Sequence, residues 1–181
     1  MTIEFIDNKN KFFSDVKTLG RKNSATLGFM PDGGFEDHAK NRCIIVAHDG
    51  KVLAGYLMYR VVFRLSRVSI VHLCVSEDYR GKGVSTALLK ALKKKYEKNY
   101  RGISLSCRTD FTYASNVWKN FGFVPLDKVR SRSYNENYLN KWWYDFNQPT
   151  LFSKSSASKV KALLDMNIIV KLREAENSET V

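Results

Sequence analysis

The chain has 181 residues, of which 44% are hydrophobic and 13% aromatic, so a wholly disordered chain is excluded and one domain, or one domain with a fragment of another, is expected. Lys and Arg number 30 against 18 Asp and Glu, and the net charge of +12 favours anionic partners such as nucleic acid, an acidic protein or a polyphosphate, although most of it is expected on solvated helix faces. The sequence has no apolar run of transmembrane length, no signal-peptide pattern in residues 1–11 and no metal-ligand spacing among its three cysteines, so it predicts a cytoplasmic protein with reduced cysteines.

The first part of the sequence predicts a strand, two helices and then three antiparallel strands. Apolar residues in steps of three and four indicate the first helix, and Asp49-Gly50 between two apolar runs is a hairpin signal. The expected ranges are a strand at Thr2–Ile6, a helix at Asn10–Leu19, a turn at Pro31–Gly34, a helix at Phe35–Arg42, and strands at Cys43–Ala47, Val52–Phe63 and Val68–Val75.

The period then changes to that of an amphipathic helix, Val84–Lys98, whose last turn is basic. A strand, a crossing helix and a further strand make a unit with parallel strands. The remaining expected ranges are a strand at Ile103–Cys107, a helix at Ala114–Asn120, a strand at Phe123–Leu126, a polar loop at Arg130–Asn137 and a strand at Lys141–Phe146, followed by a linker over residues 148–158.

The most informative segment runs from Leu73 to Ser85, where a strand leads into a loop with two glycines and the loop opens a helix. Glycines let the backbone turn sharply and approach a ligand, and the first turn of a helix presents unpaired amides with partial positive charge. Together with Arg80 and Lys82, these features predict a site for a diphosphate. A Walker-type loop is excluded because the Gly-Lys pair is followed by glycine, and a dinucleotide fingerprint because a third glycine is missing; a tight turn before a core helix stays open.

Residues 79–85 resemble the coenzyme A signature of the GNAT family of N-acetyltransferases, Arg/Gln-x-x-Gly-x-Gly/Ala. Arg80, Gly83 and Ser85 fall on its fixed positions, with serine where the family has glycine or alanine. Residues 116–123 resemble a later segment of the family, a short helix that ends in Gly-Phe. The resemblance implies an α+β (α/β) acyl-CoA N-acyltransferase fold over residues 1–147, with a mixed, mostly antiparallel sheet that splays between its fourth and fifth strands and is flanked by helices.

The same resemblance implies an N-acetyltransferase that moves an acetyl group from acetyl-CoA to a primary amine of a small molecule or protein, by direct attack in a ternary complex and without a metal. Backbone groups near Leu73 and Val75 then hold the pantetheine arm between the splayed strands, and the amides of residues 81–85 hold the diphosphate. The cofactor-binding residues implied in this way are Leu73, Cys74, Val75, Arg80, Gly81, Lys82, Gly83, Val84, Ser85 and Asn116.

Candidate acids and bases flank these segments. Direct attack needs a neutral amine, and we expect the base to be His72 or Glu77, with Asp110 as a third candidate. A strand histidine is also often a packed residue, and Glu77 also fits an exposed loop. The family's usual acid is a tyrosine, whose place is taken by Trp118, and an indole cannot release a proton near neutral pH. Either Trp118 packs on the pantetheine and a group such as Tyr113 supplies the proton, or the thiolate leaves unaided.

The acceptor is not identified by the sequence. Variable loops over Gly20–Arg42 and Arg130–Asn140 are expected to build its pocket, and the aromatic run Trp142–Phe146 either packs as a last strand or forms a wall of that pocket. Two groups of basic residues would suit an anionic acceptor: Arg60, Arg64, Arg67, Lys128, Arg130 and Arg132. Some members of the family act on aminoacyl-transfer RNA, so a toxin-like acetyltransferase with that acceptor is an alternative. A non-catalytic module that binds or senses acyl-CoA is the alternative raised by Trp118, and a homodimer stays open.

The carboxyl-terminal residues 159–181 allow two interpretations. Lys161–Val170 resembles the opening strand of a PIN-type nuclease domain, whose first metal-binding aspartate is here Asp165. The same stretch also has the spacing of an amphipathic helix. The nuclease site is not complete in this sequence, so the first interpretation predicts a fragment of a longer fusion.

Overall fold

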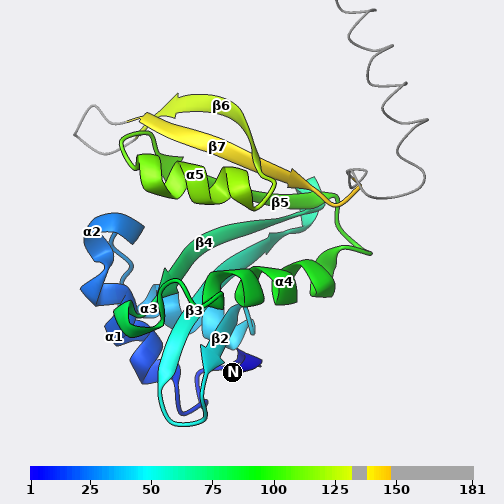
Figure 1. Cartoon of the computed structure of the whole chain (residues 1–181). Helices are drawn as coiled ribbons and strands as arrows, with labels where there is room; N and C mark the ends of the chain where they lie inside the picture. Colours follow the sequence, from blue (N-terminus) through cyan, green and yellow to red (C-terminus); the bar gives the residue numbers. More distant parts are fainter. Residues whose placement is uncertain (132–137, 148–181) are drawn as a thin grey trace, which may run out of the picture. The chain divides into compact units, whose positions relative to one another are not determined.

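A computed structural model describes residues 1–131 and 138–147 of the chain (Figure 1). The chain divides into two units, Met1–Phe146 and Asn147–Val181. The expected linker, the carboxyl-terminal segment with Asp165, and Arg132 lie outside the described residues. The predicted domain boundary near residue 147 stays a prediction.

The described residues form a seven-stranded mixed sheet in the order β1-β2-β3-β4-β5-β7-β6. Its strands are β1 (Thr2–Ile6), β2 (Ile44–His48), β3 (Leu53–Val62), β4 (Arg67–Val75), β5 (Gly102–Arg108), β6 (Val124–Arg130) and β7 (Tyr138–Asp145). The helices are α1 (Phe13–Lys22), α2 (Ser24–Leu27), α3 (Asp32–Lys40), α4 (Val84–Tyr96) and α5 (Thr112–Asn120), with 3-10 turns η1 (Phe63–Leu65) and η2 (Glu77–Tyr79). Neighbouring strands are antiparallel except β4 and β5, which α4 connects, so the predicted fold class is confirmed.

The sheet opens between β4 and β5. These strands pair only where Arg67, Val68 and Ser69 meet Gly102, Ile103 and Ser104. Beyond that point they diverge, with α4 beside β3 and β4 and α5 beside β5 and β7 (Figure 1). The edge of β4 from Ile70 to Val75 is therefore without a strand partner among the described residues, which leaves a row of backbone donors and acceptors open along the gap.

Two hydrophobic clusters cover the two faces of the sheet. Leu88 and Leu92 of α4 pack with Ile103 and Trp142 on one face. On the other face, the residues around Phe35 of α3 pack against β2 and β3 in a second cluster. Each cluster packs helices against strands that include β4. The apolar faces of α1, α3 and α4 therefore hold β4, and with it the open edge, in place.

A bulge in β4 reverses which face its residues present. Met58 pairs with His72 but Tyr59 pairs with Ile70, so Val71 is the extra residue. Ile70 consequently belongs to the α4 cluster, whereas Cys74 belongs to the α3 cluster. Strict alternation along the strand does not show this switch in the sequence.

Several expected element boundaries were wrong. The turn expected at residues 31–34 is instead the start of α3, with Pro31 in extended conformation as the N-cap and Asp32 in the first turn, where a negative charge suits the helix dipole. The first helix begins at Phe13 because the Asn10 side chain accepts a 3.0 Å hydrogen bond from the Phe12 amide and closes a turn there. The loop expected from Arg130 starts later because the polar residues of β6 are held by backbone pairing with β7, which polarity alone does not reveal.

The three cysteines are free, with Cys43 and Cys74 buried and Cys107 half-buried. Burial raises the pKa of each thiol, that of Cys74 to about 11. These thiols are therefore protonated near neutral pH and pack as small apolar groups. Across the described part of the chain, none of the helices is long and apolar enough to span a bilayer.

Candidate active site

The N-terminus of α4 has the geometry of an anion site. Gly83 is its N-cap, and Gly81 and Gly83 both adopt left-handed backbone conformations, with φ of 73° and 76°. A Cβ at either position meets nothing within 4 Å, so backbone conformation rather than crowding calls for glycine there. No side chain caps the helix, so the amides of its first turn face outward without an intrahelical partner.

The segment before this helix is anchored to the β2–β3 hairpin. The Tyr79 hydroxyl of η2 donates a 2.6 Å hydrogen bond to Asp49 Oδ2, and the Ser76 amide donates one of 2.9 Å to the Ala54 carbonyl. The first bond lowers the pKa of Asp49 and raises the pKa of Tyr79, because it favours a charged carboxylate and a neutral phenol. The two contacts fix the position of the junction between β4 and the glycine loop.

The residues predicted to hold the pantetheine arm lie on the open edge of β4. Leu73 and Val75 pack against the α4 cluster, whereas Cys74 is buried on the opposite face, next to Tyr56 in the neighbouring strand. Gly55 lets β3 approach closely, since a Cβ there would lie 2.7 Å from the Cys74 carbonyl oxygen. The side chain of Cys74 thus points away from the face that α4 covers.

Of the other predicted cofactor residues, Arg80 and Lys82 are exposed beside the glycine loop, and the Lys82 ammonium lies 5.4 Å from the centre of the Tyr79 ring. Val84, the first residue of α4, is buried, and Ser85 is half-buried. Asn116 is exposed on α5, which follows β5 across the opening from β4. The structure therefore brings the glycine-loop residues and the β4 edge together at one end of the sheet.

His72 is buried, with an exposed fraction of 3%. Its Nδ1 lies 2.9 Å from the Tyr56 hydroxyl, and its ring contacts Phe35 edge-on at 5.9 Å. Burial, with a smaller contribution from the nearby His38, lowers the pKa of His72 to about 4. Burial also raises the pKa of Tyr56, so the hydroxyl is the donor and the neutral imidazole accepts at Nδ1.

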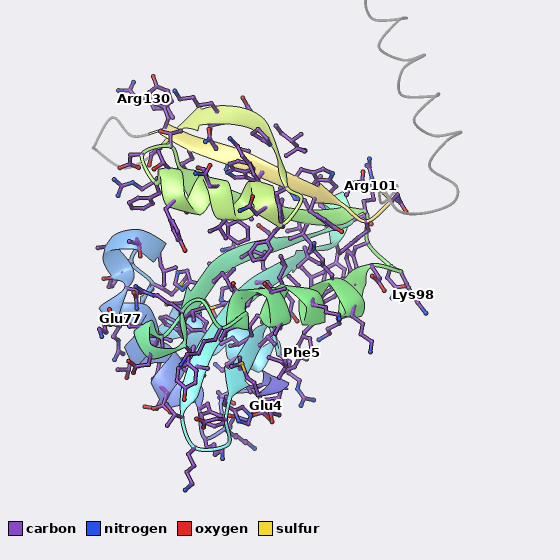
Figure 2. The ribbon with its side chains drawn as sticks, viewed as in Figure 1. Glu4, Phe5, Glu77, Lys98, Arg101 and Arg130 are labelled. Atoms are coloured by element: carbon purple, nitrogen blue, oxygen red, sulfur yellow. The ribbon has the colours of Figure 1, made fainter. Side chains whose placement is uncertain are left out.

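The remaining acid–base candidates lie apart from His72. Glu77 is exposed in η2 (Figure 2). The ammonium of Lys22, at the end of α1, lies 3.7 Å from its Oε2. Asp110 forms an ion pair with Arg108, which lowers the pKa of its carboxyl. No two of the candidates His72, Glu77 and Asp110 are hydrogen-bonded to each other in the described residues.

Trp118 and Tyr113 differ sharply in exposure. Trp118 is 8% exposed and packs edge-on against Phe123, with ring centroids 5.3 Å apart. Tyr113, near the start of α5, is 82% exposed. The indole is thus part of the core on the α4 face, whereas the phenol is free to meet a ligand.

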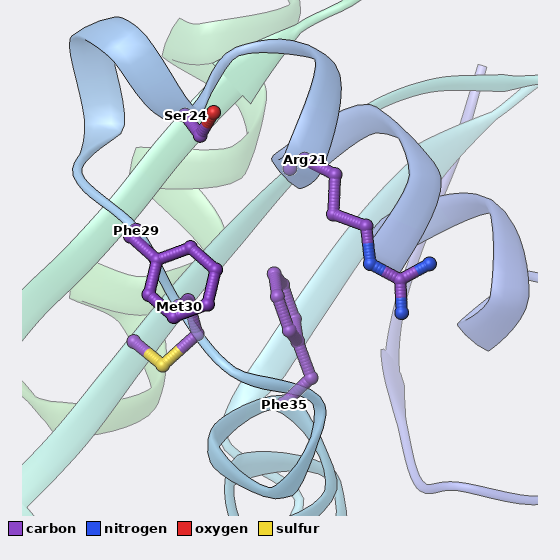
Figure 3. A pocket seen from close by; sticks show the side chains of 6 residues that line it. Arg21, Ser24, Phe29, Met30 and Phe35 are labelled. Atoms are coloured by element: carbon purple, nitrogen blue, oxygen red, sulfur yellow. The ribbon is translucent and has the colours of Figure 1, made fainter.

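Two cavities lie outside the glycine loop. A cavity of about 110 Å³, open to solvent on one side, is lined by Gly20, Arg21, Ser24, Phe29, Met30 and Phe35. Figure 3 shows the rings of Phe29 and Phe35 beside Met30, while the guanidinium of Arg21 points away from them. This cavity falls in the segment of residues 20–42 that we expect to contact the acceptor. A second cavity, of about 260 Å³, lies over the start of β4 and the neighbouring strands β5 and β7.

Comparison with known proteins now decides the family. Residues 12–123 match the sequence profile of the acetyltransferase (GNAT) family. The chain belongs to this family. An N-alpha-acetyltransferase of Sulfurisphaera tokodaii is 29% identical in an alignment over 138 residues that covers 67% of this chain and 82% of that relative.

Solved structures agree in fold. Ard1 from Thermoplasma volcanium has a TM-score of 0.70 at 20% identity, over 80% of this chain and 96% of its own. Arabidopsis thaliana NAA60 in complex with acetyl-CoA has a TM-score of 0.65 at 17% identity, over 80% of this chain and 98% of its own. The predicted family, fold class and enzyme class, an acetyl-CoA-dependent N-acetyltransferase, are confirmed. The roles of the individual site residues stay predictions.

Sequence reasoning missed two features of this region. The hydrogen bond between Tyr56 and His72 depends on the β4 bulge, which has no simple sequence signal. The polar lining of the second cavity does have one: Ser69, Ser104 and Ser106 alternate with apolar residues along their strands, which marks one polar face. No group of three or more His, Cys, Asp or Glu side chains suited to a metal occurs in the described residues.

Proposed function

We propose that the enzyme transfers the acetyl group of acetyl-CoA to a primary amine by direct attack within a ternary complex. The observation that carries this proposal is the uncapped N-terminus of α4, which lies directly after a strand edge without a partner. Amides that point outward from a helix N-terminus favour a diphosphate through hydrogen bonds and the helix dipole. The acetyl-CoA held by the related fold of NAA60 supports the same cofactor here.

In this arrangement the amides of residues 81–85 bind the diphosphate, and Arg80 and Lys82 add positive charge. The pantetheine arm lies along the open edge of β4, where the backbone of Leu73 and Val75 offers the hydrogen bonds that a neighbouring strand would otherwise make. Cys74 contributes its backbone alone, because its side chain is buried on the other face. Asn116 of α5 approaches the arm from the far side of the gap.

The chemistry follows from this placement. The neutral amine attacks the thioester carbonyl carbon, a C–N bond forms, and the C–S bond breaks as the tetrahedral intermediate collapses. The amine nitrogen gives up one proton and the departing thiolate takes up one. A backbone amide on the open edge of β4 stabilises the negative oxygen of the intermediate, since it is already oriented and lacks a strand partner.

For the proton transfers we propose that water carries the amine proton and that Tyr113 is the acid available to the thiolate. The exposed phenol of Tyr113 supports this role, and the core position of Trp118 supports packing for the indole. His72 remains a candidate base, but its burial and its bond to Tyr56 favour a role in positioning β4. Replacing His72 with alanine and finding full turnover at saturating acceptor removes it from the proton transfers.

Release of free thiol from acetyl-CoA with a panel of primary amines tests the proposal. We expect amine-dependent thiol release and acetylated product. Binding of acetyl-CoA without turnover for any amine would favour the non-catalytic sensing module instead. Action on aminoacyl-transfer RNA, a homodimer and a cytoplasmic location stay predictions. If transfer RNA binds with an affinity that does not fall as salt is added, the basic residues do not account for its binding.

A further inference from the structure

The cavity of about 260 Å³ beside the open gap is lined by two cations and three hydroxyls. Its lining residues are Arg67, Ser69, Ser104, Leu105, Ser106, Leu126, Lys141, Trp142 and Trp143. No Asp or Glu is among them, so within the described residues the cavity combines positive charge with hydrogen-bond donors. A site of this composition is suited to an anion.

Arg67 is the group that needs a partner. Its Nε is buried and makes no hydrogen bond, and Arg67 forms no ion pair with another of the described residues. A buried guanidinium donor without an acceptor is costly. Arg67 pairs with Gly102 across the β4–β5 ladder, and the Trp143 ring lies over Gly102, since a Cβ there would lie 2.6 Å from Trp143 Cζ2. The indole therefore forms one wall beside the guanidinium.

Lys141 supplies the second cation. Its ammonium donates a 2.9 Å hydrogen bond to Ser106 Oγ, which places the charge over the face of β5 that carries Ser104 and Ser106. Ser69 and Ser104 are the last paired residues of β4 and β5. The cavity thus begins at the point where the gap opens.

We propose that this cavity binds a carboxylate of the amine acceptor, so that the enzyme prefers acceptors with an anionic group at a set distance from the amine. The inference rests on the proposed acetyl transfer: with the diphosphate at residues 81–85 and the pantetheine arm along Val75 and Leu73, the thioester end of the cofactor comes beyond Leu73, near the β4 bulge. Ser69 precedes Leu73 by four residues, and at roughly 3.3 Å per residue along a strand the carboxylate lies about 7–13 Å from the attacked carbon. Acceptors with an acidic side chain or an ω-carboxylate match that span.

A matched pair of acceptors tests this preference. ω-Aminooctanoate and ω-aminooctanamide have the same length and differ in the charge of the distal group. We expect kcat/KM to be about tenfold higher for the carboxylate, the effect of a charge-assisted hydrogen bond. In Arg67→Gln the ratio of the two kcat/KM values falls to about one. Lys141→Gln also lowers this ratio, and because Lys141 is exposed, its replacement does not endanger folding. As a control, Lys90→Gln removes an exposed cation of α4 that does not line the cavity and leaves the ratio at its wild-type value.

The outcomes separate the two proposals. Equal kcat/KM for both acceptors in the wild type, or an undiminished ratio in both Arg67→Gln and Lys141→Gln, overturns the carboxylate site while acetyl transfer stands. Turnover of other amines but of neither member of the pair also overturns it. Absence of thiol release with every amine and of acetyl-CoA binding points instead to failure of the proposed function.

Discussion

His72 gives the sharpest test of how the middle of β4 is built. Burial lowers its pKa from 6.5 to about 4 in the folded chain. At a pH between these two values, the imidazole is therefore mostly protonated in the unfolded chain and mostly neutral in the folded chain. The free energy of unfolding therefore rises with pH over this window, and the contribution is lost as the pH falls below about 6.5. Linkage with these two pKa values gives a loss of about 2 kcal/mol between about pH 7 and about pH 5.

The assay compares wild type with His72→Gln by urea unfolding over that pH range. Gln retains an oxygen that accepts from the Tyr56 hydroxyl but does not titrate, so titration of all other groups cancels in the difference. We expect the wild type to lose about 2 kcal/mol relative to the variant as the pH is lowered. Parallel curves would show that His72 is solvated or protonated in the folded protein, and the interpretation of a buried neutral imidazole would be refuted.

Four further substitutions have definite expected outcomes. Gly83→Ala strains a left-handed position, so it should weaken acetyl-CoA binding about tenfold by calorimetry and lower the free energy of unfolding by about 1 kcal/mol; unchanged affinity would contradict the loop geometry. Gly102→Ala should lower the free energy of unfolding by about 1–3 kcal/mol in urea, because its Cβ would lie 2.1 Å from the Tyr144 carbonyl oxygen. Gly33→Ala in open space on α3 should raise it by about 0.5–1 kcal/mol. Burial lowers the pKa of Lys93 from 10.5 to about 8, so wild-type stability should rise relative to Lys93→Met between about pH 8 and about pH 10; a flat difference would contradict this.

Much of the fold was predictable because local signals agreed with the final packing. Asp49-Gly50 marked the hairpin, and the period of residues 84–96 marked α4, since its apolar stripe is the face that the sheet needs. The start of α3 was missed because Pro31 and two glycines normally read as a turn, and only packing of Phe35 on the sheet stabilises a helix there. The end of β6 was missed because an edge strand is held by backbone pairing that polar side chains conceal.

Within the site, only the features that depend on backbone conformation were predictable from the sequence. The glycine loop before α4 requires left-handed residues, and glycine at residues 81 and 83 is a direct sequence mark of that requirement. Side-chain roles depend instead on which face a residue occupies, and the extra residue Val71 decides this for His72. The serine face of the 260 Å³ cavity has a sequence signal, but the meeting of Arg67 with Lys141 in it does not, because these residues are brought together by the sheet order, which joins β4 to β5 and β5 to β7.

The central claim is that main-chain amides at the start of α4 bind the diphosphate of coenzyme A. Calorimetric titration of the folded protein with coenzyme A, and in parallel with pantetheine, which lacks the diphosphate, tests it most directly. We expect coenzyme A to bind at least about a hundredfold more tightly than pantetheine, the effect of two or more charge-assisted hydrogen bonds. Equal affinities, or no heat with coenzyme A at millimolar concentrations, would contradict the claim.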